Sequence, residues 1–539
     1  MHVYVSNDDS SLARGPDRPG RMNHVAVLAI AGAMLPTALA ACQTPDVDRQ
    51  AGETSTVTVA YCCGDEALNP IHDMDAKKLV FLPLMERDSL GDLVGRLATS
   101  WEPSADHREW TYRLRTDVRW HDGVPFTARD VEFTIALMDA FWDPDYGSGA
   151  FEAVTVQDDS TITIRSGHGR RLYQTYMVFY PKHLLEGLDP ERLGEWDFWA
   201  QPIGNGPYRY VRAVPGTMME FEANADFYAG VPSIDRVVLK FSGGAVIADL
   251  LSGQVDVSSD IPSADRATVA ADPRFRLYYQ MWGGSQQVIY WKSDHVLFSD
   301  PRVRRALTMA IDRRELLRAL NIPDAVPIID GPITPNQWIE RQLPQPLPHD
   351  PERARALLHE AGWRVTDGSG ILEKDGRPFR FTALVRTVSE EDSPGNVTAG
   401  VYVQSQLRKL GVEMALQALD PSVVMPRLES GEFEAVFSWF RSYETPWLQR
   451  FGLGAGEPIG YRNPRLLELI DLASRTWVLA EEDSLYAEIA EIFRADVPVT
   501  FLHPSVGLTV AHERVRGLSS PWRVEPVANM DHLWIEEGP

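Results

Sequence analysis

The first half of the chain repeats short runs in which apolar and polar residues alternate, the pattern of half-buried β-strands. The alternation occurs at residues 57–61, 110–114, 162–164 and 237–241. An Asp-Gly pair at 122–123 and a Gly-Asn-Gly-Pro segment at 204–207 predict turns between such strands. Thr127, followed three positions later by Asp130, predicts the start of a helix.

The second half changes to helices that alternate with strands. Asp-Pro pairs at 300–301 and 350–351 predict helix starts, because proline is favoured at the first helical position. Residues 379–385 and 412–416 alternate as strands, with a helical pattern over 402–410 between them. This strand–helix–strand order implies parallel strands covered by helices, and therefore an α/β fold.

The N-terminal segment has the pattern of a bacterial export signal. Arginines precede an apolar run at 25–39, which is shorter than the roughly 20 residues that a membrane-spanning helix needs. Cys42 follows Leu-Ala-Ala at 39–41, an order that resembles the lipobox of bacterial lipoproteins. The resemblance implies cleavage before Cys42 and acylation of its thiol, and each CH2 that enters the membrane contributes about 0.8 kcal/mol. An ordinary secretory signal with a chance cysteine is the alternative.

Charge and cysteine content narrow the functional classes. The formal net charge of −24 repels nucleic acid and anionic lipid, so no nucleic-acid partner is expected. Besides Cys42 the chain has only the neighbours Cys62 and Cys63, which can close only a strained ring. They are a redox pair, a pair of soft metal ligands, or two small apolar side chains near a strand end. We favour the last, because no second Cys pair or Cys-His cluster is present, and we expect no metal site and no cofactor.

Several short segments follow one another in a characteristic order along nearly the whole mature chain. They are Leu-Ala-Thr-Ser-Trp at 97–101, Trp-His-Asp-Gly-Val-Pro-Phe-Thr-Ala-Arg-Asp-Val at 120–131, Pro-Ile-Gly-Asn-Gly-Pro-Tyr at 202–208, Asn-Ala-Asp-Phe-Tyr at 224–228, Leu-Ser-Gly-Gln-Val-Asp at 251–256, Val-Arg-Arg-Ala-Leu at 303–307 and Ala-Leu-Leu-His-Glu-Ala-Gly-Trp at 356–363. In this order they resemble the peptide/nickel-type family, family 5, of extracytoplasmic solute-binding proteins that feed ABC importers. The resemblance assigns the segment with His121 and Asp122 to the scaffold, and no nucleophile motif accompanies it.

The resemblance implies a two-lobed, periplasmic-binding-protein-like α/β fold of the large type II form. A hinge joins the lobes, and the first lobe carries an extra subdomain. Closure of such a hinge around a solute is a common switching motion. The expected segments are a signal peptide at 1–41, a polar tether at 42–54, a first lobe at 55–290 with its subdomain at about 89–201, a second lobe at 291–499 and a return to the first lobe at 500–539.

The implied function is that of an extracytoplasmic lipoprotein that captures a small solute, in the first instance a peptide or a peptide-like one. It would deliver the solute to the permease subunits of an ABC transporter, which work with cytoplasmic ATPases. The expected protein is a monomer of the cell envelope, periplasmic or extracytoplasmic, held to the membrane by its lipid, and it is not an enzyme. The alternatives are an oligosaccharide, opine or metal chelate as solute, a sensor or chaperone role on the same scaffold, and an exported hydrolase.

Ligand contacts are expected in loops at the carboxyl ends of parallel strands, and where the chain crosses between the lobes. Aromatic faces there can stack on a solute, and Arg386 or Arg441 can hold a carboxylate through paired hydrogen bonds. The alternative is that the tryptophans belong to the core and the arginines to the surface. The candidates are Arg386, Asn396, Trp439, Arg441, Tyr443, Trp447 and, on the crossing segment 282–291, Trp282.

One position departs from the family pattern. Peptide-binding relatives often carry an aspartate shortly after the tryptophan at the place of Trp439, where it pairs with the amino group of the peptide. Here the sequence is Trp-Phe-Arg-Ser-Tyr-Glu-Thr-Pro at 439–446, and Arg441 would oppose a cation near Glu444. The departure leaves room for an anionic, sugar-like or opine-like solute. Nickel has no support, because no closely spaced histidine pair is present outside the Trp-rich segments.

Overall fold

The computed structural model describes most of the chain after the N-terminal segment. The described residues are 54–61, 76–87, 93–105, 108–141, 151–166, 177–259, 261–262, 265–332, 345–387, 395–441, 458–476, 479–518, 527 and 529–536. The predictions on the export signal, on Cys42 and on Cys62 and Cys63 lie outside these residues, and so do Tyr443 and Trp447.

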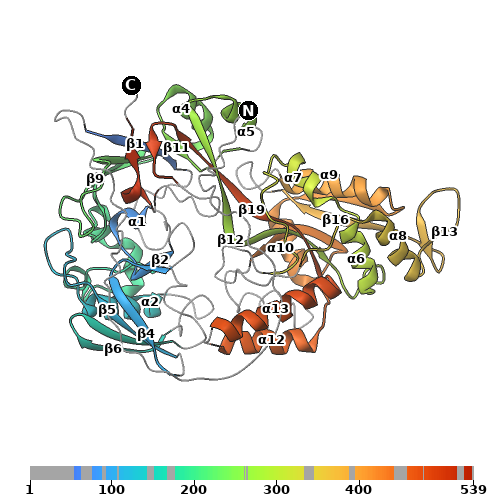
Figure 1. Cartoon of the computed structure of the whole chain (residues 1–539), viewed down its shortest axis with the longest axis horizontal. Coiled ribbons are helices and arrows are strands. Elements are labelled where there is room, and N and C mark those ends of the chain that lie inside the picture. The colour runs from blue at the N-terminus through green and yellow to red at the C-terminus, as the bar shows by residue number, and fades with distance from the viewer. Residues whose placement is uncertain are drawn as a thin grey trace, which may run out of the picture.

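One mixed sheet of ten strands extends through both halves of the protein (Figure 1). Strands β12 and β19 pair antiparallel at its centre. β16 pairs in parallel with β17 and β18, and β1 pairs in parallel with β10 and β11, which confirms the α/β prediction. In sheet order the strands are β17 (Glu413–Leu419), β16 (Arg380–Arg386), β18 (Ala435–Arg441), β12 (Phe275–Trp291), β19 (Val499–His512), β11 (Val257–Ser258), β1 (Thr56–Tyr61), β10 (Arg236–Phe241), β9 (Met218–Ala223) and β8 (Tyr208–Val214).

The first lobe is defined as the described residues before β12 and after β19. Besides its part of the large sheet it holds a four-stranded antiparallel sheet in the order β4-β5-β7-β6, against which helix α2 packs. Its other elements are α1 (Lys77–Val80), β2 (Met85–Arg87), β3 (Leu93–Gly95), β4 (Ala98–Pro103), β5 (Glu109–Leu114), α2 (Ala128–Phe141), β6 (Phe151–Asp158), β7 (Thr161–Ser166), α3 (Lys182–Leu185), α4 (Val246–Ser252), α5 (Arg266–Ala271), β20 (Val515–Arg516) and β21 (Trp534–Ile535), with short 3-10 turns at Pro190–Glu195, Asp197–Ala200, Gly243–Ala245 and Met530–His532.

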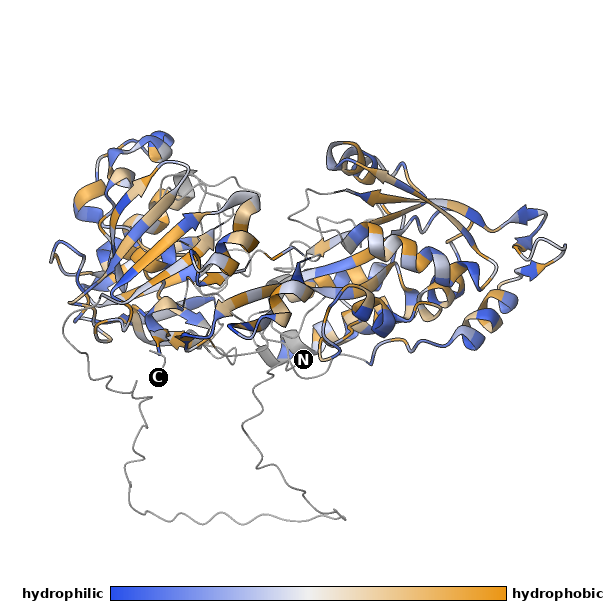
Figure 2. Ribbon diagram, turned by 90° about the horizontal axis from the view of Figure 1, so that it is seen from above, coloured by the Kyte–Doolittle hydropathy of each residue, from blue (hydrophilic) through white to orange (hydrophobic). Residues whose placement is uncertain are grey.

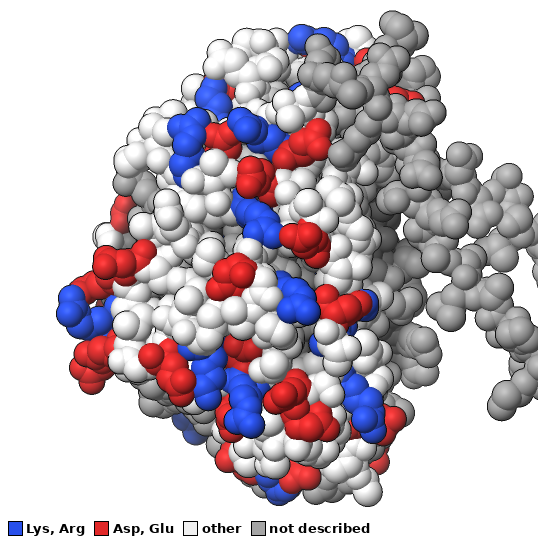
Figure 3. Space-filling view, turned by 90° about the vertical axis from the view of Figure 1, so that its left-hand side faces the viewer, with Lys and Arg blue, Asp and Glu red and all other residues white. Residues whose placement is uncertain are grey.

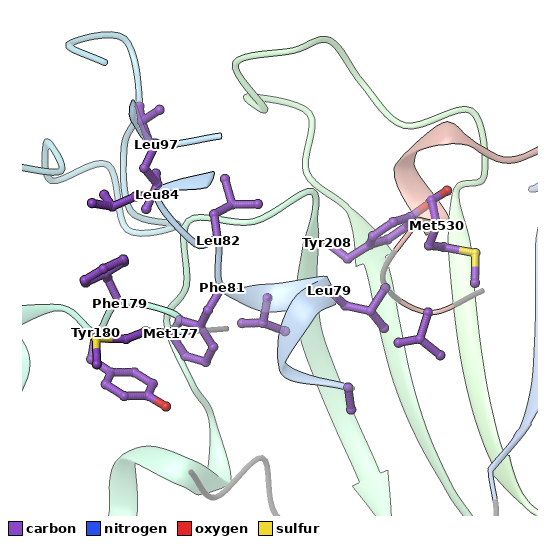
Figure 4. Close-up of a cluster of buried hydrophobic side chains, with 14 of the residues drawn as sticks. Leu79, Phe81, Leu82, Leu84, Leu97, Met177, Phe179, Tyr180, Tyr208 and Met530 are labelled. Atoms are coloured by element: carbon purple, nitrogen blue, oxygen red, sulfur yellow. The ribbon is translucent and has the colours of Figure 1, made fainter. Parts of the chain in front are cut away.

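The core of the first lobe joins segments that are far apart in the sequence (Figure 4). The rings of Phe81 and Tyr180 meet edge to face with their centres 5.3 Å apart. The hydroxyl of Tyr208 donates to the carbonyl of Met530 at 3.4 Å, so the end of the chain returns to this lobe. Burying each such aromatic side chain stabilises the fold by roughly 2 to 3 kcal/mol.

The segment with His121 belongs to this scaffold. The main-chain N–H of His121 donates to the carbonyl of Gly204 at 2.7 Å, and its Nδ1 accepts from the N–H of Gly204 at 3.2 Å. Its Nε2 then carries the proton and donates to the carbonyl of Gly206 at 3.1 Å. Burial lowers the pKa of His121 to about 4. A Cβ at Gly204 would lie 1.9 Å from the carbonyl oxygen of Val80, so only glycine fits this close approach.

The second lobe is defined as the described residues between β12 and β19. Separate apolar cores cover the two faces of its part of the sheet, one beneath α6 to α9 and the other beneath α10, α12 and α13. Its elements are α6 (Pro301–Met309), α7 (Arg313–Ala319), α8 (Pro351–Glu360), β13 (Arg364–Val365), β14 (Leu372–Lys374), β15 (Arg377–Pro378), α9 (Gly395–Arg408), α10 (Pro421–Ser430), α12 (Pro464–Arg475) and α13 (Leu479–Asp496).

The predicted helix starts are confirmed in both lobes. A carboxylate oxygen of Asp300 accepts from the N–H of Arg302 at 2.9 Å, and Asp350 accepts likewise from Arg353 at 2.9 Å. At α2, Asp130 accepts from the N–H of Thr127 at 2.8 Å and the Thr127 hydroxyl accepts from the N–H of Arg129 at 3.3 Å, so the predicted helix start is capped. These caps satisfy N–H groups that the first turn of a helix leaves without partners.

Strands β12 and β19 cross between the two lobes (Figure 1), which the view from above shows as two separate halves joined at the middle (Figure 2). Residues 275–281 of β12 pair with 506–512 of β19, next to β11 of the first lobe. Residues 286–290 of β12 pair with 499–504 of β19, next to β18 of the second lobe. The register shifts between these two stretches, and shifts once more after Gln287. Such irregularities bend a strand pair and leave polar groups outside the regular ladder.

The outer face of the first lobe mixes acidic and basic side chains (Figure 3). On its four-stranded sheet, for example, Arg165 pairs with Glu109 and with Glu152 at 3.0 Å each. Exposed pairs of this kind contribute little to stability because water screens them. Among the helices that the structure describes, none combines the length and the apolar character needed to cross a membrane.

Candidate functional site

Four of the predicted contacts lie in regular elements where loops were expected, and the first of them, Arg386, is the last residue of β16. Strand β18 continues to Arg441, so Trp439 and Arg441 belong to the strand itself. Asn396 lies in the first turn of α9, which begins at Gly395, earlier than the helical pattern alone indicated. Trp282 lies within β12; for Trp282 and Arg441 the structure describes the backbone and not the side chain.

Gln287 brings three of the predicted residues together at the lobe crossing. Its Nε2 donates to Oδ1 of Asn396 at 2.7 Å, and Nδ2 of Asn396 donates to the carbonyl of Arg386 at 3.2 Å. In the sheet, Gln287 lies directly opposite Trp439 of β18 and His503 of β19. The side chains of Gln287 and Asn396 are fully buried. A hydrogen-bonded chain therefore links β12, α9 and the end of β16 where the lobes meet.

The neighbouring Gln286 points to the other face of the sheet, because side chains alternate along a strand. Its Nε2 donates to the carbonyl of Gly331 at 2.7 Å. Gly331 lies close to Ala490 of α13: a Cβ atom placed on Gly331 would be 3.3 Å from the Cβ of Ala490. Gln286 is fully buried as well. Both faces of β12 thus carry a buried amide at the crossing.

His503 supplies the histidine of this region, which we name the crossing cluster: Gln286, Gln287, Asn396, Trp439 and His503. Its Nδ1 lies 2.6 Å from the carbonyl of Pro504 and donates to it, so Nε2 carries a lone pair. Burial lowers the pKa of His503 to about 4, and the charge of Arg266 acts in the same direction. Its ring meets Trp439 edge to face, with centres 6.1 Å apart. His503 is therefore neutral at ordinary pH.

The crossing cluster contains buried acceptors that no described group satisfies. Within the described part of the chain, Oε1 of Gln286, Oε1 of Gln287 and Nε2 of His503 have no hydrogen-bond partner. A buried acceptor without a donor costs about 1 to 3 kcal/mol, and such groups are rare in folded proteins. Two of these acceptors, on Gln287 and His503, lie opposite each other on neighbouring strands, so this pair suits a molecule that brings its own N–H or O–H groups.

Arg266 provides a positive charge close to the crossing cluster. It begins α5, which packs against β12. The side chain is half-buried, and its buried Nε has no hydrogen-bond partner among the described residues. The residue lies close enough to Tyr279 of β12 and to His503 for its charge to affect the pKa of each.

Sequence reasoning identified the crossing segment and Trp439 but missed Gln286, Gln287, His503 and Arg266. The signal for the first two was present, because two consecutive amides directly precede the apolar run of 288–291. His503 directly follows the mostly apolar segment Val-Thr-Phe-Leu at 499–502. Arg266 carries no such signal. Over the described ranges, no three His, Cys, Asp or Glu side chains come close enough together to hold a metal ion.

Comparison with solved structures supports the fold. The structure resembles that of a putative peptide binding protein AppA from Clostridium difficile, with a TM-score of 0.74 at 20% identity, over 89% of this chain and 100% of that one. It also resembles NikZ from Campylobacter jejuni, solved in complex with Ni(L-His), with a TM-score of 0.68 at 24% identity, over 89% of this chain and 99% of that one. Both matches support the two-lobed α/β fold that the resemblance implied.

Comparison of sequences supports the family. The Oligopeptide-binding protein AppA of Bacillus subtilis (strain 168) is 26% identical over 455 residues, which cover 80% of this chain and 81% of that protein. The sequence model described as "Bacterial extracellular solute-binding proteins, family 5 Middle" matches residues 92–453. This match spans more than half of the sequence, and the chain therefore belongs to the bacterial extracellular solute-binding proteins of family 5.

Proposed function

We propose that this protein captures a peptide or peptide-like solute between its two lobes and delivers it to the permease of an ABC importer. The observation that carries the proposal is the pair of open acceptors on Gln287 and His503, which lie opposite each other on neighbouring strands of the described sheet. A peptide backbone presents N–H groups at regular intervals, so it can satisfy several such acceptors at once. The relative from Bacillus subtilis is named for oligopeptide binding, which agrees with this chemistry.

The two lobes would open and close about β12 and β19. We propose the boundaries that the sequence suggested: a first lobe at 55–290 with a subdomain at about 89–201, a second lobe at 291–499 and a return at 500–539. Two crossing strands allow the lobes to rotate while each apolar core stays intact. A permease can then distinguish loaded from empty protein by shape.

The proposed solute contacts surround the crossing cluster. Aromatic rings would stack on the solute, and the arginines would hold its anionic groups through paired hydrogen bonds. Asn396 is the member whose own hydrogen bonds are in place, to Gln287 and to the carbonyl of Arg386. The proposed contacts are Trp282, Arg386, Asn396, Trp439, Arg441, Tyr443 and Trp447.

The remaining proposals concern the location and the chemistry. Residues 1–41 would be the signal peptide and Cys42 the residue that carries the lipid, with 42–54 as a tether to the membrane. The protein would act as a monomer with separate permease and ATPase subunits. As a binding protein it would return its solute unchanged, and this property distinguishes it from an exported hydrolase.

A thermal-unfolding screen of the purified full chain in mild detergent tests the proposal. The library would contain di- to hexapeptides, oligosaccharides, opines and nickel chelates. A solute at 100 times its Kd stabilises the folded protein by about 2.7 kcal/mol, which is readily seen as a higher Tm. We expect a shift with peptides, and mass spectrometry should recover them intact. A shift with only one of the other classes, or cleavage of the peptide, would contradict the proposal.

A further inference from the structure

The parallel strands of the first lobe end on the side that faces the second lobe. β11 pairs antiparallel with β19, with Val257 opposite Ala511 and Ser258 opposite Val510. Because β19 enters the first lobe from the second, β11 runs the other way, and its carboxyl end points to the crossing (Figure 1). β1 and β10 are parallel to β11 and end at the same edge. Such sheets usually bind small molecules at the carboxyl ends of their strands.

The parallel strands of the second lobe end at the crossing as well. The last residue of β18, Arg441, lies opposite Ser285 of β12, beside the register shift of that strand. β16 is parallel to β18 and ends at Arg386. The carboxyl ends of both sets of strands therefore face the crossing from opposite sides. The proposed contacts on β16 and β18 belong to the second-lobe side, and a solute between the lobes needs a counterpart on the first.

Five residues form a single row along this edge of the first lobe. Tyr278 of β12 lies opposite Thr509 of β19, and the hydroxyls of Thr509 and Ser259 are 3.0 Å apart. The register of β1 on β11, continued by one residue, places Tyr61 next to Ser259. Tyr61 lies opposite Phe241 of β10, with ring centres 6.3 Å apart. Residues opposite each other in a sheet share a face, and we name this set the edge row: Tyr278, Thr509, Ser259, Tyr61 and Phe241.

The edge row combines partly exposed rings with hydroxyl groups. The rings of Tyr61, Phe241 and Tyr278 all pack against the core of the first lobe and are only half-buried. Between these rings, Thr509 is buried and Ser259 is half-buried, and their hydroxyls can both donate and accept hydrogen bonds. Partly exposed rings favour edge-to-face or offset contact with a further ring. This row therefore suits a solute that has aromatic side chains and polar main-chain groups.

We propose that the edge row is the first-lobe face of the solute site and that it selects peptides with an aromatic side chain. The row crosses β12, β19, β11, β1 and β10. With about 4.8 Å between neighbouring strands it is about 19 Å long, which equals about six residues of extended peptide at about 3.3 Å each. A ring of the peptide would pack on Tyr61 and Phe241. This inference rests on the proposed function and adds a side-chain preference to it.

The test compares two sets of hexapeptides that are random except at one central position. One set carries phenylalanine there, and the other carries cyclohexylalanine, which is similar in size but has no π-system. The readout is the concentration that half-saturates the thermal shift of the purified full chain in mild detergent. Contacts between aromatic rings change binding about 2- to 10-fold, and we expect the phenylalanine set to bind more tightly by this factor. Tyr61→Leu combined with Phe241→Leu should reduce the ratio to about 1, because both rings are lost while apolar side chains still cover the core.

The matched control is Tyr210→Leu, which removes a half-buried ring of the first lobe that lies outside the edge row. Tyr210 packs edge to face on Phe221, with ring centres 5.8 Å apart. The register aligns both residues with Val237, near the start of β10 and away from its carboxyl end. Tyr210→Leu should leave the ratio of the two peptide sets unchanged.

A cross-linking experiment tests the subsite without any substitution. Hexapeptides with benzoylphenylalanine at the central position should, on irradiation, label members of the edge row, and mass spectrometry locates the label. If hexapeptides bind but the label is confined to the second lobe, the wild-type ratio is 1 or lower, or the double variant keeps the wild-type ratio, the subsite is wrong while the proposed function stands. If no hexapeptide binds, the proposed function fails, and the subsite fails with it.

Discussion

Two buried histidines in this protein have similarly lowered pKa values but differ in how many of their ring nitrogens have hydrogen-bond partners among the described residues. Burial lowers the pKa of both His121 and His503 to about 4. In the first-lobe scaffold, both ring nitrogens of His121 bond to main-chain groups of the turn that contains Gly204. At the lobe crossing, Nδ1 of His503 is bonded, and Nε2 has no partner among the residues that the structure describes. The complete hydrogen bonds of His121 hold the fold together, whereas the open acceptor of His503 is where the proposed solute would bind.

The pH dependence of stability has the largest expected effect and tests the feature that the two histidines share. As the pH falls below about 6.5, the unfolded chain takes up protons at both rings, while the folded protein does not until about pH 4. The free energy of unfolding should therefore fall as the pH drops from about 6.5 to about 4, by up to about 3 kcal/mol for each histidine. Above about pH 6.5 the two histidines should contribute no further dependence on pH. Urea unfolding between pH 7 and 4 measures it. His121→Gln and His503→Gln should each remove part of the slope, and equal slopes in all three proteins would refute the assignment.

Substitution of Gly204 tests the scaffold half of the comparison. A Cβ there would collide with the carbonyl of Val80, so Gly204→Ala should lower the free energy of unfolding by about 3 kcal/mol. Gly244→Ala is the control, since nothing lies within 4 Å of its built Cβ. Denaturant unfolding of both variants provides the measurement. Equal stabilities would show that the turn does not lie against α1 as described.

Asn396→Ala tests the other side of the comparison, the hydrogen bonds at the lobe crossing. The substitution leaves Nε2 of Gln287 buried without its acceptor, which should cost about 2 kcal/mol of stability. It should also weaken solute binding, whereas Thr398→Ala, at an exposed position of the same helix, should change neither. Calorimetric unfolding and a binding titration separate the two effects. Unaltered binding would remove Asn396 from the proposed site.

The smallest change in stability is expected for His503→Gln, which makes the contrast with His121 sharpest. Because one nitrogen of His503 has a hydrogen-bond partner in the described structure, its replacement by an amide should change the free energy of unfolding by less than about 1 kcal/mol. Solute affinity should nevertheless fall. His121→Gln should show the reverse, with lower stability and unchanged affinity. A strongly destabilised His503→Gln protein with normal affinity would assign His503 to the scaffold.

Local chemistry explains which elements could be predicted. Asp300 and Asp350 cap their helices through N–H groups only two or three residues away, so the short segment contains all the information. The predicted ends of β18 and α9 were less accurate. β18 runs on to Arg441, because Ser285 to Trp291 of β12 offer it pairing partners that are remote in sequence.

The site could be predicted only in part for the same reason. Trp439 and Asn396 were identified as candidates from the ends of strands, and the structure joins them through Gln287. Nothing near Gln287 in the sequence indicates that its partner lies on α9. Likewise, Arg266 and His503 are separated by more than 230 residues in the sequence. Only the packing of α5 and β19 on β12 brings Arg266 close enough for its charge to affect the pKa of His503.

The sequence by itself determined the helix starts, the glycine turn at Gly204, the alternation of strands and helices, and the order of segments that identifies the family. These features depend on neighbours along the chain or on recurring blocks of residues. Only the tertiary structure decided which buried polar groups have partners, because hydrogen bonds and charges act through space between strands that the chain connects at long range. That is why the satisfied His121 and the open His503 could be told apart only after folding.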